Sequence, residues 1–270
     1  AYLPSEHESG GGRFALPWRA ESELVVGRFA RAQGIKAPGR LVSSAKSWLC
    51  HDGVDRTAAL LPWASPDEVQ KISPLEASTA FIRHLVESWA CTYPQFGPLG
   101  AQEVVLTVPA SFDAIARDLT VRAARAAGIE RPVLLEEPQA ALYSWLDSKG
   151  DTWRNHLNEG DVVLVIDVGG GTTDFSLMAI DSDGGALALR RIAVGDHILL
   201  GGDNMDLALA YAVRQQIAQE RGLKLDTWQV QALTQGCRIA KEALFADPAL
   251  ASQPIAIPSR GSKLIGGTIR

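Results

Sequence analysis

The sequence has few cysteines, no excess of positive charge and no long apolar run, and each absence argues against a class of function. Its three cysteines, Cys50, Cys91 and Cys237, stand far apart in the 270 residues. None belongs to a Cys-x-x-Cys pair or lies at a zinc-ligand spacing from a histidine. We therefore expect buried, reduced thiols and no zinc site.

The charge balance argues against a nucleic-acid partner. The formal net charge is -5, and basic residues form no stripe that would match a phosphate backbone. The sequence also shows no charged-then-apolar leader and no uncharged run of membrane-spanning length. We expect neither nucleic acid nor membrane as a partner, and a cytoplasmic location as the default.

Length and composition indicate a globular chain with more than one lobe. A chain of 270 residues exceeds the usual size of one domain, and its 46% hydrophobic residues are enough for a sizeable core. The chain starts at Ala1 and stops at Arg270, directly after a strand-like stretch. Both ends are therefore expected to be boundaries within a longer protein.

The pattern of the first half predicts mixed α/β structure. Few elements can be placed in the first seventy residues. Ser73 and Glu76 then form a capping box that opens an amphipathic helix. Strands are predicted at 103–108 and 132–135, helices at 112–127 and 139–146, and a polar connection between lobes at 147–160.

The second half opens with a continuous apolar run, residues 162–166, suited to a strand buried on both faces. Two further strands and a short turn predict a three-stranded antiparallel meander. The predicted elements are strands at 174–180 and 186–194, helices at 204–219 and 229–245, and a hairpin of 255–257 with 263–269.

A glycine-rich segment between two apolar strands carries the clearest chemistry. Its sequence is Asp167-Val168-Gly169-Gly170-Gly171-Thr172-Thr173-Asp174. The three glycines leave the backbone free of side chains, so successive N–H groups can approach phosphate oxygens. Asp167 is suited to hold a hydrated magnesium ion, since Mg²⁺ prefers one or two carboxylates with water and phosphate. Thr172 and Thr173 add hydroxyl donors.

This segment differs from two other phosphate-binding loops. A Walker loop has a lysine after its glycines, and this segment has none. A dinucleotide fingerprint leads into a helix, whereas a strand follows here. An ordinary glycine-rich turn would explain the glycines but not the flanking aspartates and threonines. The pattern indicates a phosphate-binding hairpin.

Four segments, in order, resemble the nucleotide-binding domain of the heat-shock protein 70 (DnaK-like) chaperone family. They are the strand and proline loop at 104–112, the acidic segment at 134–141, the glycine hairpin, and the glycine loop at 200–206. The resemblance implies a two-lobed actin-like ATPase (ribonuclease H-like) fold, with ATP or ADP and magnesium in the cleft. The fold would be incomplete here. Lobe I, residues 1–150, would lack the first phosphate-binding hairpin, and lobe II, residues 151–270, would end within its outer subdomain.

The resemblance also implies roles for single residues. Asp167 would contact the metal through water and take part in catalysis with Thr172. The phosphate contacts would come from Gly169, Gly170, Gly171, Thr172 and Thr173. Glu137 would position the attacking water or the waters of the metal. Lys46, in a segment similar to the family's catalytic lysine, would contact the γ-phosphate. A surface acid before a proline and a solvated lysine are the plain alternatives.

Two further matches concern coupling between domains. Pro109 and Arg117 match positions that link nucleotide state to the attached peptide-binding domain. The alternative is a strand-ending proline and a helix-surface arginine. Gly201 and Gly202 would bring backbone close to the phosphates, or would simply form a turn before a helix that Asp203 or Asn204 caps.

The helix predicted at 229–245 departs from the family pattern. Lys241 matches a nucleotide-contacting position of the helix that grips adenine. The acidic, basic and serine positions of that motif are here Arg238, Glu242 and Phe245. Adenine contacts would therefore differ, and the base preference stays open. The alternative is an amphipathic helix with an exposed salt-bridge face.

We expect the full-length parent to hydrolyse ATP and to use lobe closure to drive a linked module that binds client polypeptides. A J-domain co-chaperone and a nucleotide-exchange factor would be its partners. Because one phosphate hairpin and the adenosine loop are absent, these 270 residues alone are expected to bind ATP weakly or not at all. Two alternatives stay open: a nucleotide-binding regulatory module without turnover, and a small-molecule kinase of the actin-like fold.

Overall fold

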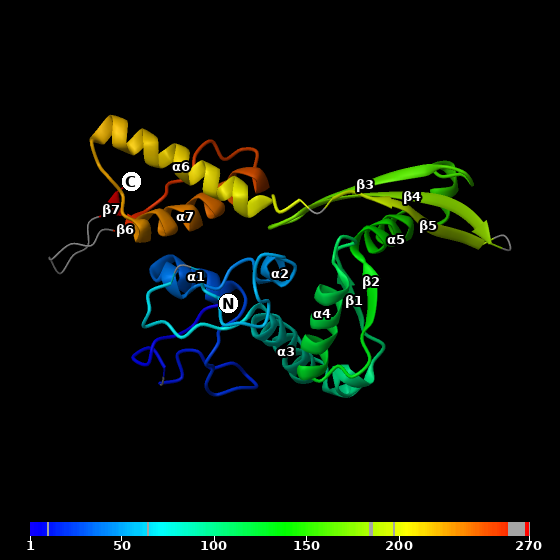
Figure 1. The fold of residues 1–270 in the computed structure, drawn as a ribbon, viewed down its shortest axis with the longest axis horizontal. Coiled ribbons are helices and arrows are strands. Elements are labelled where there is room, and N and C mark those ends of the chain that lie inside the picture. The colour runs from blue at the N-terminus through cyan, green and yellow to red at the C-terminus, as the bar shows by residue number, and fades with distance from the viewer. Residues whose placement is uncertain (10, 64, 184–185, 197, 259–267, 270) are drawn as a thin grey trace.

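The computed structural model describes residues 1–9, 11–63, 65–183, 186–196, 198–258 and 268–269, which form an α/β chain (Figure 1). The helices are α1 (Arg28–Lys36), α2 (Ala45–Leu49), α3 (Pro74–Thr92), α4 (Ala114–Ala126), α5 (Glu137–Lys149), α6 (Gly202–Arg221) and α7 (Thr227–Ala246). Short 3-10 turns lie at Pro38–Arg40, Pro94–Phe96, Leu99–Ala101 and Gly150–Asn155. The strands are β1 (Val105–Val108), β2 (Val133–Glu136), β3 (Val162–Val168), β4 (Thr173–Asp183), β5 (Ala186–Val194), β6 (Ile257–Pro258) and β7 (Thr268–Ile269). The predicted fold class, α/β, is confirmed.

The first seventy residues contain helices α1 and α2, which the sequence pattern did not predict. Helix α1 buries mainly small or polar residues, Ala30, Gln33 and Gly34, so it carries no clear apolar stripe. Gly34 lies directly against Leu41, where a Cβ would come within 2.6 Å of the leucine side chain. Close packing through a small residue therefore replaces the usual large apolar contacts.

Helix α3 begins as predicted. The Ser73 hydroxyl accepts from the Glu76 N–H at 3.1 Å, and the Glu76 carboxylate accepts from the Ser73 N–H at 2.7 Å. Pro74 occupies the first turn, where its missing N–H costs no hydrogen bond. The capping box and the helix it opens are confirmed.

Strands β1 and β2 form a parallel pair in which Val108 stands opposite Glu136. Helix α4 starts two residues later than predicted, since Asp113 caps it by accepting from the Ala116 N–H at 2.6 Å. Helix α5 starts two residues earlier, because Pro138 fits its first turn and brings Glu137 into the helix. It continues to Lys149 and a 3-10 turn follows, so the predicted polar connection is partly helical.

The antiparallel meander is confirmed, in the order β3, β4, β5. Helix α5 covers one face, where Leu142 packs with Met178 and Ile180 (Figure 1). On the other face of β3, four apolar side chains are 53% to 56% exposed: Val162, Leu164, Ile166 and Val168. The prediction that this strand is buried on both faces is wrong for the described residues, because they place no helix over its second face.

Helices α6 and α7 lie side by side above α1 and α2 in Figure 1, and the meander extends away from them. Their shared core contains Ala210, Leu233 and Cys237. Strand β6 pairs with β7 in antiparallel register, as the predicted hairpin requires, while residues 259–267 lie outside the described part. No helix of the described residues is both long enough and apolar enough to cross a bilayer.

Candidate functional site

A cavity of about 470 Å³ brings together residues from both halves of the chain. Its wall is built from α1, the start of α2, the first turn of α5, the glycine hairpin and α7. Seven of the predicted site residues line it: Lys46, Glu137, Asp167, Gly169, Gly170, Gly171 and Thr172. Four others do not: Thr173, Gly201, Gly202 and Lys241.

The glycine hairpin docks onto the N-terminus of α6. The Gly169 N–H donates to the Thr172 carbonyl at 2.8 Å, which closes the turn between β3 and β4. The Gly169 and Gly170 carbonyls accept from the N–H groups of Gly202 and Asp203, at 3.0 and 2.6 Å. These bonds satisfy two of the N–H groups that the first turn of a helix leaves unpaired. Loop and helix are thus held as one unit.

Close backbone approach explains two of the glycines. At Gly201 a Cβ would lie 2.5 Å from the Gly169 carbonyl oxygen and 2.7 Å from that of Gly170. At Gly171 a Cβ would overlap the Ser47 hydroxyl. A larger residue at Gly201 would push the hairpin backbone away, whereas one at Gly171 would require the Ser47 side chain to move. Gly201 is the N-cap of α6, which agrees with the interpretation as a turn before the helix, and it packs against the hairpin. Its approach to a phosphate stays a prediction.

Lys46 and Glu137 meet across the cavity. Lys46 lies in the first turn of α2, Glu137 in the first turn of α5, and their side chains form an ion pair. The Glu137 side chain is only 18% exposed, whereas Lys46 is more open to solvent. The two residues assigned to the phosphate end by resemblance are therefore adjacent in space, although 91 positions separate them.

The surroundings of Asp167 fit a magnesium ion held through water. Asp167 lines the cavity, and its carboxylate forms no hydrogen bond or ion pair with any other side chain in the described part of the chain. Those residues contain no cluster of three or more acidic, histidine or cysteine ligands. One free carboxylate beside a phosphate loop suits Mg²⁺, which takes much of its coordination from water and phosphate.

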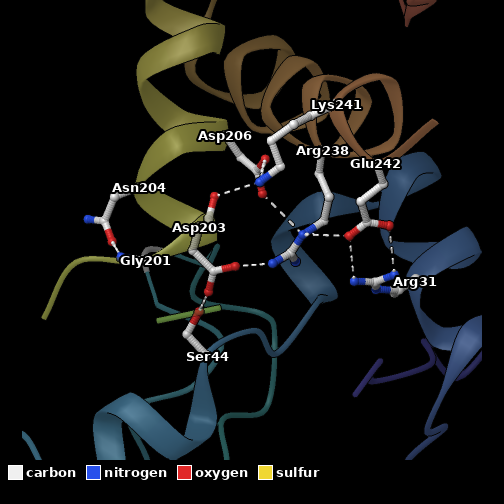
Figure 2. Close-up of polar contacts among 10 residues, drawn as sticks. Arg31, Ser44, Gly201, Asp203, Asn204, Asp206, Arg238, Lys241 and Glu242 are labelled. Atoms are coloured by element: carbon white, nitrogen blue, oxygen red, sulfur yellow. Dashed lines mark hydrogen bonds and ion pairs between the residues drawn. The ribbon is translucent and has the colours of Figure 1, made fainter. Parts of the chain in front are cut away.

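Lys241 lies behind the glycine loop, in a network of charged side chains (Figure 2). Its ammonium group is 2.6 Å from Asp206 Oδ1 and donates to the Gly202 carbonyl at 3.0 Å. Arg238 pairs with Asp203 and, at 3.1 Å, with the buried Asp206. The network fixes the start of α6 against α7, so Lys241 supports the glycine loop from outside the cavity wall.

The prediction that Asp203 or Asn204 caps α6 is wrong. Gly201 is the N-cap, and Asn204, three positions into the helix, accepts from the Gly201 N–H at 2.9 Å. Asp203 instead pairs with Arg238 and accepts a hydrogen bond from Ser44 (Figure 2). The carboxylate of Asp203 is therefore used for tertiary contacts, which a local capping rule does not anticipate.

Two residues that sequence reasoning missed line the cavity from the N-terminal part. Ser44 precedes α2, and Arg31 lies in α1, where it pairs with Glu242 of α7 at 3.2 Å. The serines on either side of Lys46 were a usable signal for a polar site. Arg31 gave no signal, because α1 itself was not predicted.

Comparison with known proteins identifies the family of this chain. The family model described as "Hsp70 protein" matches residues 19–261. The chain belongs to the Hsp70 family.

Two relatives illustrate the relation to other Hsp70 proteins. The chain is 29% identical over 238 residues to "Chaperone protein DnaK" of Thermus thermophilus, covering 82% of this chain and 36% of the relative. It is 32% identical over 259 residues to "Chaperone protein HscA homolog" of Acidithiobacillus ferrooxidans, covering 90% of this chain and 39% of the relative. The chain thus spans well under half the length of these Hsp70 relatives. Membership of the family implies an actin-like ATPase fold.

Pro109 and Arg117, the two positions predicted to couple domains, lie outside the cavity. Pro109 follows β1 and is fully buried. Arg117, in α4, donates to the Phe112 and Ala110 carbonyls at 3.0 and 3.2 Å and to Glu136 at 3.0 Å. Through these hydrogen bonds Arg117 holds the loop after β1 in place. It is therefore not a simple solvated arginine on the helix surface.

Of the three cysteines, Cys237 is buried as expected and Cys50 is half-buried. Burial raises the pKa of the Cys50 thiol to about 11 and that of Cys237 to about 11. Both thiols therefore stay protonated at neutral pH. Cys91 is exposed, contrary to the expectation, because it lies on the solvent side of α3 near the helix end.

Proposed function

We propose that the full-length protein is a DnaK-like molecular chaperone, and that this chain belongs to its ATP-binding domain. The observation that carries the proposal is the meeting of Lys46, Glu137, Asp167 and the glycine hairpin in one cavity. Phosphoryl transfer depends mainly on positioning and on electrostatic stabilisation, and these residue types supply both. ATP or ADP is the proposed ligand, with magnesium as the metal.

Each residue has a proposed task. The N–H groups of Gly170 and Gly171 and the Thr172 hydroxyl bind phosphate oxygens, while Gly169 shapes the turn through its bond to the Thr172 carbonyl. Lys46 offsets charge on the γ-phosphate. Glu137 orients the attacking water, and Asp167 holds water molecules of the magnesium ion. When bound, magnesium neutralises phosphate charge. Thr173, Gly201, Gly202 and Lys241 hold the hairpin in place and so serve nucleotide binding indirectly.

The lobe closure, domain coupling and partners of the full-length protein are proposed from family membership. Lobes of residues 1–150 and 151–270 would close on the nucleotide, and Pro109 and Arg117 would carry that change to a peptide-binding domain. Client polypeptides, a J-domain co-chaperone and a nucleotide-exchange factor are the proposed partners, and the cytoplasm is the proposed location. Neither alternative, the regulatory module or the small-molecule kinase, is favoured by the chaperone relatives.

The decisive experiment compares the full-length protein with an Asp167→Asn variant. We expect magnesium-dependent ATP hydrolysis in the wild type and a loss of at least about 100-fold in the variant, because one preorganised charge is removed from the site. Phosphate release measures turnover, and calorimetry measures binding. Asp196→Asn is the matched control, since Asp196 is exposed and does not line the cavity. Wild-type binding without turnover would favour the regulatory module, and no binding would refute the proposal.

A further inference from the structure

Glu136 is held by two arginines that come from distant parts of the chain. Its Oε1 accepts from Arg117 of α4 at 3.0 Å, and the same oxygen pairs with Arg191 of β5. The Glu136 side chain is only 14% exposed. Water therefore screens these ion pairs less than it would on an open surface.

Glu136 stands directly before Glu137, which lines the cavity. Glu136 ends β2 in an extended conformation, and Glu137 begins α5. Neighbouring side chains of an extended segment point to opposite sides. Accordingly, Glu136 faces the two arginines, while Glu137 pairs with Lys46. The buried Pro138 restricts the backbone on the other side of Glu137. Fixing Glu136 therefore also fixes the direction of the Glu137 carboxylate.

Arg191 supplies the long-range part of this arrangement. It stands opposite Met178 in the β4–β5 register, beside the irregularity between Leu177 and Met178. The same meander carries Asp167 and the glycine hairpin between β3 and β4. Figure 1 shows the end of β2 and the start of α5 beside this meander. Arg191 thus ties the sheet that carries Asp167 to the residue that precedes Glu137.

The charges favour the same arrangement. Glu136 and Glu137 are adjacent carboxylates, and like charges this close repel each other. Each is compensated separately, Glu137 by Lys46 and Glu136 by the two arginines. Removing Arg191 would leave Glu136 with one cation, and its remaining carboxylate oxygen, Oε2, already lies buried without a hydrogen-bond partner in the described residues.

We propose that Arg191 is a positioning residue: acting through Glu136, it sets the orientation of Glu137 relative to Asp167 and the glycine hairpin. The proposal rests on the proposed function of the cavity and assigns Arg191 no contact with the nucleotide. Loss of such a positioning residue should lower the rate of the chemical step and leave nucleotide affinity nearly unchanged.

The first test measures single-turnover ATP hydrolysis and ATP affinity in the full-length protein, for Arg191→Met and Arg191→Lys. For Arg191→Met we expect a rate about tenfold or more lower, with affinity unchanged within about twofold, because a small misplacement of a catalytic group is costly. Arg191→Lys keeps the charge and should recover part of the rate. Arg190→Met is the matched control, since this neighbour pairs with Asp181 and is 64% exposed.

The second test does not depend on turnover. Hydrogen exchange of a peptide covering the first turn of α5 is measured without nucleotide in the same variants. We expect faster exchange in Arg191→Met than in the wild type and no change in Arg190→Met. A wild type without ATPase activity would refute the proposed function, and the exchange result would still decide the role of Arg191. Unchanged exchange in Arg191→Met, or a loss confined to ATP affinity, would overturn the inference.

Discussion

The buried Arg56 holds two aspartates, one of which caps helix α4. The Arg56 side chain is 9% exposed and donates to Asp113 at 2.8 Å and to Asp52 at 2.7 Å. Asp113 is also the N-cap of α4. The hydrogen bond from Arg56 holds the pKa of Asp113 below its ordinary value of 3.8. Ionised Asp113 therefore stabilises the fold at neutral pH, and this contribution disappears as pH falls through the lowered pKa.

We expect Asp113→Ala to lower the free energy of unfolding by about 1 to 2 kcal/mol at pH 7, since it removes a helix cap and one partner of Arg56. Urea unfolding at pH 7 and at about pH 3 measures the effect, and the difference from wild type should shrink at the lower pH. Asp118→Ala, an exposed residue of the same helix, is the control. An equal loss at both pH values would show that the charge of Asp113 contributes nothing.

Single residues of the candidate site were predictable where their signal is local. Asp167 and the glycines stand in one short motif, and Glu137 precedes a proline in a second. Arg191 and Arg31 act through partners 55 and 211 positions away. No short pattern marks such pairs, because the fold alone brings them together.

At the level of elements, the contact between the hairpin and α6 leads us to predict that nucleotide binding depends on a small residue at Gly201. We expect Gly201→Ala to weaken nucleotide binding by about tenfold or more, because the new Cβ would displace two hairpin carbonyls and misplace the phosphate loop. Calorimetry with ATP and magnesium on the full-length protein tests this. Gly195→Ala is the control, since its Cβ would lie 3.4 Å from the Phe175 side chain, an ordinary contact. Equal affinities in the two variants would contradict the docking argument.

Elements bounded by clear capping or turn residues were predicted well, and elements with weak amphipathic patterns were not. The capping box before α3 is a local signal and was confirmed, and so was the antiparallel order of the three meander strands. Strand β4 runs on to Asp183, so the turn predicted from Asp181 begins too early. Helix α1 was missed because it packs through small residues. The apolar run of β3 was taken as buried on both faces, since a run of this kind does not say what covers it.

At the scale of the whole molecule, both polar and apolar side-chain contacts join residues before 150 to residues after it. Glu242 pairs with Arg31 and Asp203 with Ser44 on one side of the cavity (Figure 2). Away from the cavity lining, Glu136 pairs with Arg191, Ser111 donates to Asp174, and Leu142 packs with Met178. The two contacts beside the cavity, Arg31 with Glu242 and Ser44 with Asp203, are polar, and an exposed ion pair such as the first contributes little to stability.

We expect Glu242→Gln to change overall stability by less than about 1 kcal/mol, because its pair with Arg31 is exposed, yet to speed nucleotide release. Stopped-flow release of a fluorescent ATP analogue from the full-length protein measures the effect. Glu220→Gln is the control, since Glu220 is exposed on α6 and accepts from Gln216 of the same helix. A release rate equal to that of the wild type would show that the Arg31 contact does not hold the cavity closed.

The arrangement of the thiols has a practical consequence. Maleimide reagents attack thiolates, so at neutral pH they will react with Cys91 far faster than with Cys50 or Cys237, whose thiols remain protonated. A fluorophore can therefore be attached to α3 without first replacing the other two cysteines of this sequence. With a labelled nucleotide as the second fluorophore, energy transfer between the two labels would report binding and release of the nucleotide in real time.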